Sequence, residues 1–241
     1  MSAFASLVAA AVAWVVFHIG VSGTGLRDAI VSRIGEGPFR GLFVVASFAL
    51  LYWLGTAYGA AGPLEVFWQA PRWLVVLGMW LLLPATLLLV CSLSQPNPTS
   101  VRGKRALEAE NPATGILRIT RHPMLWAFVL WGVVHLVALG TLSAALLTGA
   151  IIVTALAGMP SLDAKYARRN PERWPGFAAA TSIVPFVAIA QGRNRFAWRE
   201  LGWWRPWLAI VLWGGLIALH GLRAVLHAAQ DFFGCRLVVL H

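Results

Sequence analysis

Apolar residues occur along the chain in long runs that are separated by shorter polar segments. Runs of about twenty residues are long enough to cross the hydrocarbon region of a bilayer as helices. Backbone groups find no water there, so only helices or closed barrels span it, and runs without polar alternation exclude a barrel. The pattern predicts an all-α, polytopic transmembrane helical bundle that forms a single domain over residues 1–241. Its spans, about six, lie near 3–22, 39–59, 73–93, 122–140, 142–159 and 206–226.

The polar segments predict how the spans are joined. Residues 94–112 carry mixed charge between prolines and are typical of a surface loop. Residues 113–121 combine apolar side chains (Ile116, Leu117, Ile119) with basic ones (Arg118, Arg121), which predicts a half-buried approach to the fourth span. The stretch "TSIVPFVAIA" at 181–190 is too short to span and is interrupted by Pro185. It predicts an interfacial or re-entrant piece rather than a seventh span.

The distribution of charged residues predicts how the bundle is oriented in the membrane. Only 12% of the residues are charged, about half of what a soluble domain carries, yet the net charge is +10. Lys and Arg gather in loops 23–40, 94–121 and 160–205, which favours a cytoplasmic position for these loops and excludes nucleic acid as the expected partner. We therefore expect a multi-pass protein of the bacterial inner membrane with both termini periplasmic and membrane lipid as a partner.

The N-terminal run and the two cysteines add little chemistry. No basic segment precedes the first run and no small-residue cleavage site follows it, so we expect a retained helix rather than a signal peptide. Cys91 and Cys235 fall on opposite sides of the membrane in this topology. We expect no disulfide between them, and neither belongs to a metal-spaced cluster.

Three histidines, His18, His135 and His220, lie inside apolar runs. An ionisable group in a span costs about 2–3 kcal/mol on insertion scales and usually faces the bundle interior. Neutral imidazole is a common ligand for transition metals and for haem iron. The competing interpretation is a neutral histidine that hydrogen-bonds between helices.

Depth in the membrane separates the three histidines. Counted from the basic side at about 1.5 Å per residue, His135 and His220 both lie roughly 20 Å deep, and His18 lies roughly 13 Å deep. Depth alone therefore favours pairing His135 with His220. Trp14 and Trp131 each precede a histidine by four residues, which puts an aromatic ring on the same helix face.

A second cluster, of Arg118, Arg121 and His122, lies at the basic end of the fourth span. Such a cluster suits a carboxylate or phosphate, such as a haem propionate or the tail of a soluble cofactor. Lipid-headgroup anchoring is an equally good interpretation. His122 lies about 140° around the helix from His135, so we do not expect these two to share one ligand.

The chain resembles the NnrU family of bacterial membrane proteins, which also includes 15-cis-zeta-carotene isomerase. The resemblance rests on "FHIG", "LRD", "IGEGPFRGLF" and "PRWLVVLG" in the first third of the chain. It is most specific in "RHPMLWAFVLWGVVHLVALGTL" at 121–142 and extends through "DAKYARRNPERWPGFAAATSIVPFVAIAQGRNR" at 163–195.

For the isomerase branch, the resemblance implies a haem b held by histidines of the first and fourth spans, here His18 and His135 as metal ligands. That branch has a cysteine three residues before the second histidine, implicated in redox-dependent ligand exchange, where this chain has Gly132. The NnrU branch is linked to denitrification and nitric oxide metabolism.

A more distant resemblance points to isoprenylcysteine carboxyl methyltransferase-type proteins. It rests on "TGILRITRHPM" at 114–124 and "LDAKYARRNPERWPGFAAATSIVPF" at 162–186. There the Arg-His-Pro segment helps to hold S-adenosylmethionine, which would use His122 and the arginines. The methyltransferase pattern has a glutamate pair where this chain offers only Asp163.

The leading hypothesis is an NnrU-like membrane protein that binds haem b through His135 together with His18 or His220. Its role would be redox or linked to nitric oxide. There are three alternatives. The first is an isomerase of the 15-cis-zeta-carotene isomerase type, which would act on an apolar small molecule by cis–trans isomerisation of a carotenoid-type polyene. The second is a membrane methyltransferase that uses S-adenosylmethionine, and the third is a non-catalytic scaffold. The sequence leaves open whether the chain is an enzyme.

Overall fold

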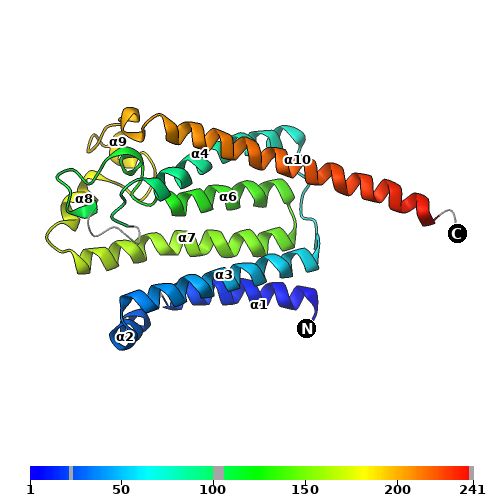
Figure 1. Ribbon diagram of the computed structural model, residues 1–241, viewed down its shortest axis with the longest axis horizontal. Helices are drawn as coiled ribbons and strands as arrows, with labels where there is room; N and C mark the ends of the chain where they lie inside the picture. Colours follow the sequence, from blue (N-terminus) through cyan, green and yellow to red (C-terminus); the bar gives the residue numbers. More distant parts are fainter. Residues whose placement is uncertain (22–23, 100–105, 239–241) are drawn as a thin grey trace.

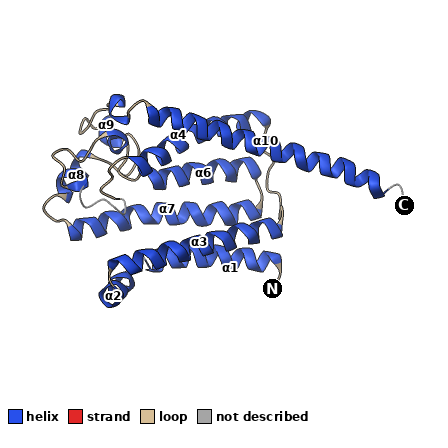
Figure 2. Cartoon of the chain, viewed as in Figure 1, coloured by secondary structure: helices blue, strands red, loops and turns tan. Residues whose placement is uncertain are grey.

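The computed structural model describes residues 1–21, 24–99 and 106–238, with side chains as far as Gly221. It is an all-α bundle, and apart from one isolated bridge between Val66 and Thr141 the described residues contain no β-structure (Figure 2). Each predicted span is a helix. The six long helices are α1 (Ala3–Val16), α3 (Glu36–Ala61), α4 (Arg72–Ser94), α6 (Pro123–Leu139), α7 (Leu142–Arg169) and α10 (Trp204–Val238).

The helices have the lengths and composition of membrane spans. Four stretches of the described residues are long and apolar enough to cross a bilayer: Ala3–Val21, Glu36–Ala61, Arg72–Ser94 and Leu142–Arg169. Helix α6 is equally apolar but has only 17 residues. Its short length still suits a span, since the hydrocarbon core requires about 17–25 residues. The all-α membrane bundle expected from the sequence is confirmed.

Helix α7 lies in the middle of the bundle (Figure 1). It packs against α1 and α3 on one side and against α6 on the other, while α4 lies between α6 and α10. Small side chains allow the close approach of α7 to its neighbours. Ala10, Ala57 and Ala150 share one buried cluster, and a Cβ at Gly132 would lie only 2.6 Å from Ile152 Cγ1. Packing of this kind stabilises helix pairs in lipid, where apolar burial alone provides no driving force.

Two predicted boundaries differ from the structure. Helix α7 continues to Arg169, ten residues beyond the expected end of its span at 159, and contains Pro160. Proline is tolerated in a membrane helix when neighbouring groups satisfy the freed carbonyl, so its presence did not mark an end. The expected surface loop 94–112 is also partly buried, because Asn97, Pro98 and Leu107 lie in the interior.

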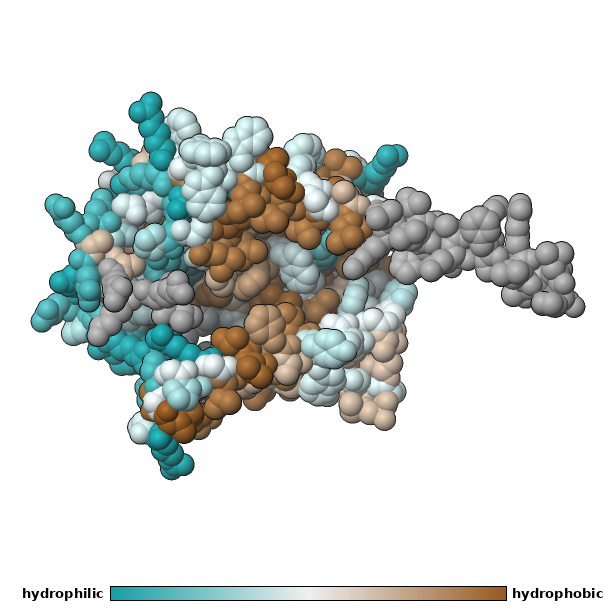
Figure 3. Space-filling model, viewed as in Figure 1, coloured by the Kyte–Doolittle hydropathy of each residue, from teal (hydrophilic) through white to brown (hydrophobic). Residues whose placement is uncertain are grey.

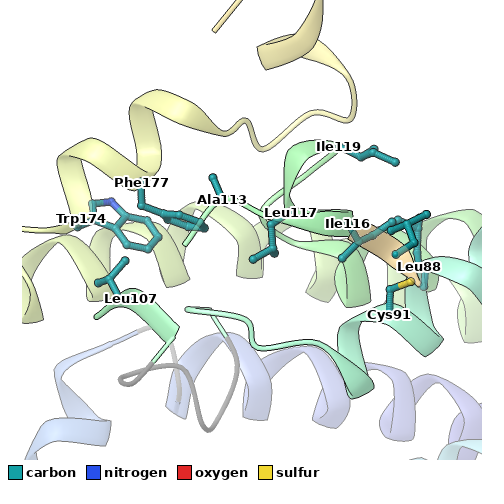
Figure 4. Close-up of a cluster of buried hydrophobic side chains, with 11 residues drawn as sticks. Leu88, Cys91, Leu107, Ala113, Ile116, Leu117, Ile119, Trp174 and Phe177 are labelled. Atoms are coloured by element: carbon teal, nitrogen blue, oxygen red, sulfur yellow. The ribbon is translucent and has the colours of Figure 1, made fainter. Parts of the chain in front are cut away.

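Polar side chains gather at one end of the bundle, which we call the basic end (Figure 3). It carries α2 (Gly25–Ile34), the 3₁₀ turn η2 (Gly115–Arg118), α8 (Trp174–Ala180), α9 (Val187–Ala190) and the 3₁₀ turn η3 (Trp198–Leu201). Beneath these short elements lies a core in which Leu88 and Cys91 of α4 approach Ile116 of η2, with Trp174 and Phe177 of α8 at its other side (Figure 4). Helix α1 begins, and α10 ends, toward the opposite end of the bundle.

The segment 181–190 does not span. It folds back over the basic end as expected, and its backbone bonds to the approach to α6. Arg121 N–H donates to Ser182 O (3.0 Å) and Phe186 N–H to Ile119 O (2.9 Å). Trp126 of α6 donates its indole N–H to Ile183 O (2.8 Å). These bonds fix the start of α6 against the segment that follows α7.

At the opposite end, the extended segment 63–71 crosses the corner between α6 and α7. Gly140 ends α6 with φ of 59°, the left-handed conformation that favours glycine. Its carbonyl accepts a hydrogen bond from Phe67 N–H (2.8 Å), and Trp68 donates its indole N–H to Val137 O (2.8 Å). A Cβ at Gly140 would lie 2.2 Å from Trp68 O, so this corner has no room for a side chain.

Replacing Gly140 with alanine is expected to destabilise the protein by roughly 1–3 kcal/mol, because the left-handed backbone becomes strained and the Trp68 backbone must move away. Thermal unfolding in detergent measures the loss. Gly59→Ala on α3 is the matched control, since a Cβ there meets nothing within 4 Å and φ is not positive. Equal melting temperatures for the two variants would contradict the prediction.

Candidate functional site

Two of the three intramembrane histidines lie together. His135 of α6 and His220 of α10 have ring centroids 6.5 Å apart, with their planes at 55°. His135 is half-buried and His220 is exposed at the edge of the bundle. The structure thus brings together the pair that equal depth favours.

The backbone fixes the tautomer of both rings. Nδ1 of His135 lies 2.8 Å from Trp131 O, and Nδ1 of His220 lies 2.7 Å from Leu216 O. A carbonyl oxygen only accepts, so each Nδ1 carries a hydrogen, and in the neutral form of the ring each Nε2 has a lone pair. In the described part of the chain, neither Nε2 has a hydrogen-bond partner. A histidine whose far nitrogen is held by a carbonyl is the form that ligates metals.

Both helices that carry this pair also carry a tryptophan within two turns of the histidine. Trp131 lies 4.6 Å from the His135 ring, centroid to centroid. On α10, Trp213 precedes His220 by two turns. Its ring lies 4.9 Å from that of Trp80 of α4, tilted by 33°, and its indole N–H donates to Met79 O (2.7 Å). Trp213 therefore packs α10 against α4 with its indole N–H hydrogen-bonded.

The histidine pair fits a haem better than a bare metal ion. The described residues contain no group of three or more His, Cys, Asp or Glu side chains able to hold a metal. A haem needs only one or two axial ligands, because the macrocycle supplies the others. With metal–nitrogen bonds of about 2 Å, two imidazoles on one iron would have ring centres roughly 6 Å apart, close to the 6.5 Å observed.

His18 lies elsewhere, in the π-helical turn Phe17–Val21 that follows α1. Its Nδ1 is 2.9 Å from Trp14 O and its Nε2 is 3.2 Å from Ser47 Oγ of α3. The rings of Trp14 and Phe43 lie 4.0 and 5.5 Å from its centroid. Both ring nitrogens are thus within hydrogen-bond distance of oxygen atoms, as in a packed helix–helix contact.

Helix α7 also determines how far His18 and His135 lie from each other along the bundle. Ala10 shares a buried cluster with Ala150 of α7, and Gly132 packs against the same part of α7. His18 lies eight residues from Ala10 toward the basic end, and His135 three residues from Gly132 toward the opposite end. At 1.5 Å per residue, the two histidines are separated axially by roughly 16 Å. The structure does not bring this pair together, and their joint ligation of haem stays a prediction.

Arg121 and His122 of the predicted basic cluster both bond to a carboxylate, that of Asp163. His122 is 2% exposed, and its Nε2 lies 2.8 Å from Asp163 Oδ1. Arg121 donates Nε–H and Nη2–H to Asp163 Oδ2, at 2.8 and 2.5 Å. Nδ1 of His122 is buried and has no hydrogen-bond partner among the described residues. Sequence reasoning treated Asp163 as an isolated acid, and the 42-residue separation from Arg121 gave no signal of this contact.

Arg118 turns away from Arg121 and His122. Its Nε–H and Nη2–H donate to the two oxygens of Glu200, each at 2.7 Å, and its Nη1–H donates to Asn194 Oδ1 at 2.6 Å. Glu200 also accepts from Gly115 N–H (2.7 Å). The three residues of the predicted anion cluster therefore serve two separate networks, each with its own carboxylate.

The Arg118–Glu200 contact predicts a pH dependence. Hydrogen bonding to Arg118 lowers the pKa of Glu200, so its stabilisation is present above the ordinary glutamate pKa of about 4.3 and is lost as pH falls through the lower folded pKa. We expect residues 193–203 to become protease-sensitive in acid. In the Glu200→Gln variant, cleavage should be raised already at neutral pH and should change little with acidification. If cleavage of the variant depended on pH as it does in the wild-type protein, Glu200 would not be the group responsible.

Comparison with known proteins places this chain among relatives. The profile of the NnrU protein family matches residues 6–228. The chain is 30% identical over 195 residues to a chloroplastic 15-cis-zeta-carotene isomerase of Arabidopsis thaliana, covering 74% of this chain and 48% of the relative. It is 27% identical to the same enzyme of Zea mays, covering 75% and 49%.

The match covers part of each plant relative. The chain spans about half the length of the curated relatives that it matches. No solved structure is significantly similar to it. The family profile nevertheless extends over all six long helices, at least in part, and includes His18, His135 and His220. The chain belongs to the NnrU protein family.

Proposed function

We propose that this protein binds haem b between α6 and α10 through His135 and His220, and that it isomerises an apolar, conjugated polyene within the membrane. The observation that carries the proposal is the pair of rings 6.5 Å apart whose Nδ1 atoms both bond to backbone carbonyls. Polyene chemistry is supported by the printed activity of the two plant relatives. A role in denitrification rests on the family name alone.

The chain would contribute orientation and exclusion of water. Haem iron supplies reversible electron transfer or Lewis acidity to a bound partner. Trp131 O orients the His135 ring, and Leu216 O orients the His220 ring. The indole rings of Trp80 and Trp213, tilted by 33° to each other, would provide apolar contacts for a conjugated chain. The apolar helices keep water away from these contacts.

Ligand exchange by a thiol at position 132 is not part of this proposal. Gly132 is buried, and a Cβ there would meet Ile152 Cγ1 at 2.6 Å and Ile152 Cδ1 at 3.0 Å. That side chain position faces α7, so the glycine serves helix packing. Any change in iron ligation would therefore involve His220, which is exposed and lies on the longest helix.

We also propose a multi-pass protein of the bacterial inner membrane with the basic end in the cytoplasm. Arg and Lys residues of α2, the end of α7 and the connecting segments gather at that end, as the positive-inside rule requires. In a Cys235→Ser background, which removes the native cysteine expected on the periplasmic side, a cysteine introduced at exposed Glu172 on the basic end should react with an impermeant maleimide only after the cells are opened. Labelling of intact cells would reverse the orientation.

The first test is an absorption spectrum of the detergent-purified protein, oxidised and then reduced with dithionite. The proposal predicts a Soret band and split α/β bands on reduction, typical of six-coordinate haem b. A visible spectrum that stays flat after haem is supplied during expression would overturn haem binding. Isomerisation is tested separately by chromatography of 15-cis and all-trans polyene in a carotenoid-producing host.

Methyl transfer is the second candidate because Nδ1 of buried His122 has no partner within the described part of the chain. The arginines argue against an open S-adenosylmethionine site, since Arg121 already bonds Asp163 and Arg118 bonds Glu200. Calorimetric titration with S-adenosylmethionine would decide. Binding that disappears in Arg121→Ala would favour this candidate over the haem proposal.

A further inference from the structure

A second feature of the membrane region, separate from the histidine pair, is an apolar pocket between α1, the π-helical turn, α2 and α3. Its volume is about 460 Å³, within the roughly 300–1,000 Å³ typical of small-molecule sites. The lining is wholly apolar and includes Val16, Phe17, Gly20, Val21, Leu26 and Leu50. Val16 and Leu26 are 61% and 51% exposed, so the pocket opens on the outer face of the bundle, where lipid would lie.

The rim of this pocket is strongly basic. On α2, at the start of α3 and over residues 165–169 of α7, the charged residues are two acids and six cations: Asp28 and Glu36, with Arg27, Arg33, Arg40, Lys165, Arg168 and Arg169. Both acids are already shared. Glu36 pairs with Arg27 (2.5 Å), Arg40 (3.0 Å) and Arg169 (3.9 Å), and Asp28 pairs with Arg27 and Arg169. This end of the molecule therefore keeps a surplus of positive charge.

Two of these cations are placed to meet a headgroup above the pocket. Arg33 lies two turns after Leu26, which puts both on one face of α2, and among the described residues it makes no ion pair. Arg40 precedes Leu50 by ten residues along α3, or about 15 Å. Half of the hydrocarbon core of a bilayer is also about 15 Å thick. The distance from pocket to cations thus matches one acyl chain of a single leaflet.

We infer that this pocket binds an anionic phospholipid, with one acyl chain against Gly20 and Leu50 and the phosphate headgroup at Arg33 and Arg40. The apolar lining and opening suit a flexible chain that enters from the bilayer. The basic rim requires a negative headgroup, which a hydrocarbon polyene lacks. The inference is independent of the haem proposal, since neither His135 nor His220 lines the pocket.

The test uses the full chain in nanodiscs that contain either phosphatidylglycerol or phosphatidylcholine, each with a diazirine in one acyl chain. After illumination, cross-linked peptides are mapped by mass spectrometry. We expect phosphatidylglycerol to label residues 13–26 and the region of Leu50 at least fivefold more than phosphatidylcholine. Equal labelling by the two lipids would overturn the inference.

Two sets of variants locate the binding. A Cβ at Gly20 meets nothing within 4 Å, so Gly20→Leu fills the pocket without a clash and should reduce labelling at least fivefold. Gly59→Leu, also in open space but outside the pocket, should leave labelling unchanged. Arg33→Gln with Arg40→Gln should abolish the preference for phosphatidylglycerol.

Two results would contradict the binding of an anionic lipid in this pocket. Undiminished labelling in Gly20→Leu would overturn the inference, as would displacement of the lipid by a diazirine hydrocarbon that lacks a headgroup. The latter result would assign the pocket to an apolar substrate. Gel filtration of each variant confirms that the bundle is folded, and the haem spectrum plays no part in this readout, so the two proposals fail or hold separately.

Discussion

Replacement of His135 with glycine is expected to remove the Soret band of the purified protein, and free imidazole added to that variant should restore it. The reason is the geometry at α6 and α10, where Nε2 of His135 is unbonded while its Nδ1 is held by Trp131 O at 2.8 Å. Rescue by imidazole separates a lost ligand from a lost fold. The measurement is the reduced-minus-oxidised difference spectrum at matched protein concentration.

His220 and His18 provide the comparison. His220→Ala should convert a six-coordinate spectrum into a five-coordinate one, because the partner ring 6.5 Å away is removed. His18→Ala should leave the spectrum unchanged, since Trp14 O and Ser47 Oγ surround that ring. A spectrum lost in His18→Ala and kept in His220→Ala would instead support the ligand pair implied by the isomerase branch.

The second large effect is expected from Asp163→Ala, a loss of about 3–5 kcal/mol in the free energy of unfolding. Asp163 accepts from Arg121 and His122, and the side chains of all three are at most 15% exposed. Removing the carboxylate leaves the Arg121 charge without its carboxylate partner in the interior. It also removes the hydrogen bond between the His122 ring and Asp163. Thermal and denaturant unfolding in detergent measure the change.

A matched control is Glu172→Ala, which removes an exposed acid at the same end of the bundle. We expect it to change the free energy of unfolding by less than about 0.5 kcal/mol, as for ordinary surface positions. Asp163→Asn should lie between the two, because its amide oxygen still accepts one bond. Equal stability of Asp163→Ala and Glu172→Ala would show that the buried network does not hold the basic end together.

The number and order of the spans were predictable from the sequence because a run of twenty apolar residues has few other physical solutions. The end of α7 was not. Hydropathy stops near Met159, and Pro160 resembles a helix end, yet the helix continues to Arg169. The ten additional residues are held by contacts of Asp163 with Arg121 and of Arg169 with Glu36. Such tertiary contacts leave no periodic signal.

The candidate site was partly predictable. Equal depth favoured His135 with His220, since helix rise converts sequence distance from the basic end into a position in the membrane. Proximity in the lateral direction depends on which helices are neighbours, and α10 reaches His135 only because it packs beside α4. Similarly, Arg118, Arg121 and His122 are adjacent in sequence but turn to Glu200 or Asp163, which follow much later in the chain.

The central position of α7 has a consequence for biosynthesis. Helices α1 and α3 pack on each other and on α7, yet α7 is complete only about 100 residues after α3 ends. At roughly 5–20 residues per second, the first pair waits on the order of 5–20 s after its own insertion. During that time the Ala10, Leu54 and Ala57 surface faces lipid or other helices. Correct assembly in a crowded membrane would then depend on translation speed and on a chaperone that shields this surface.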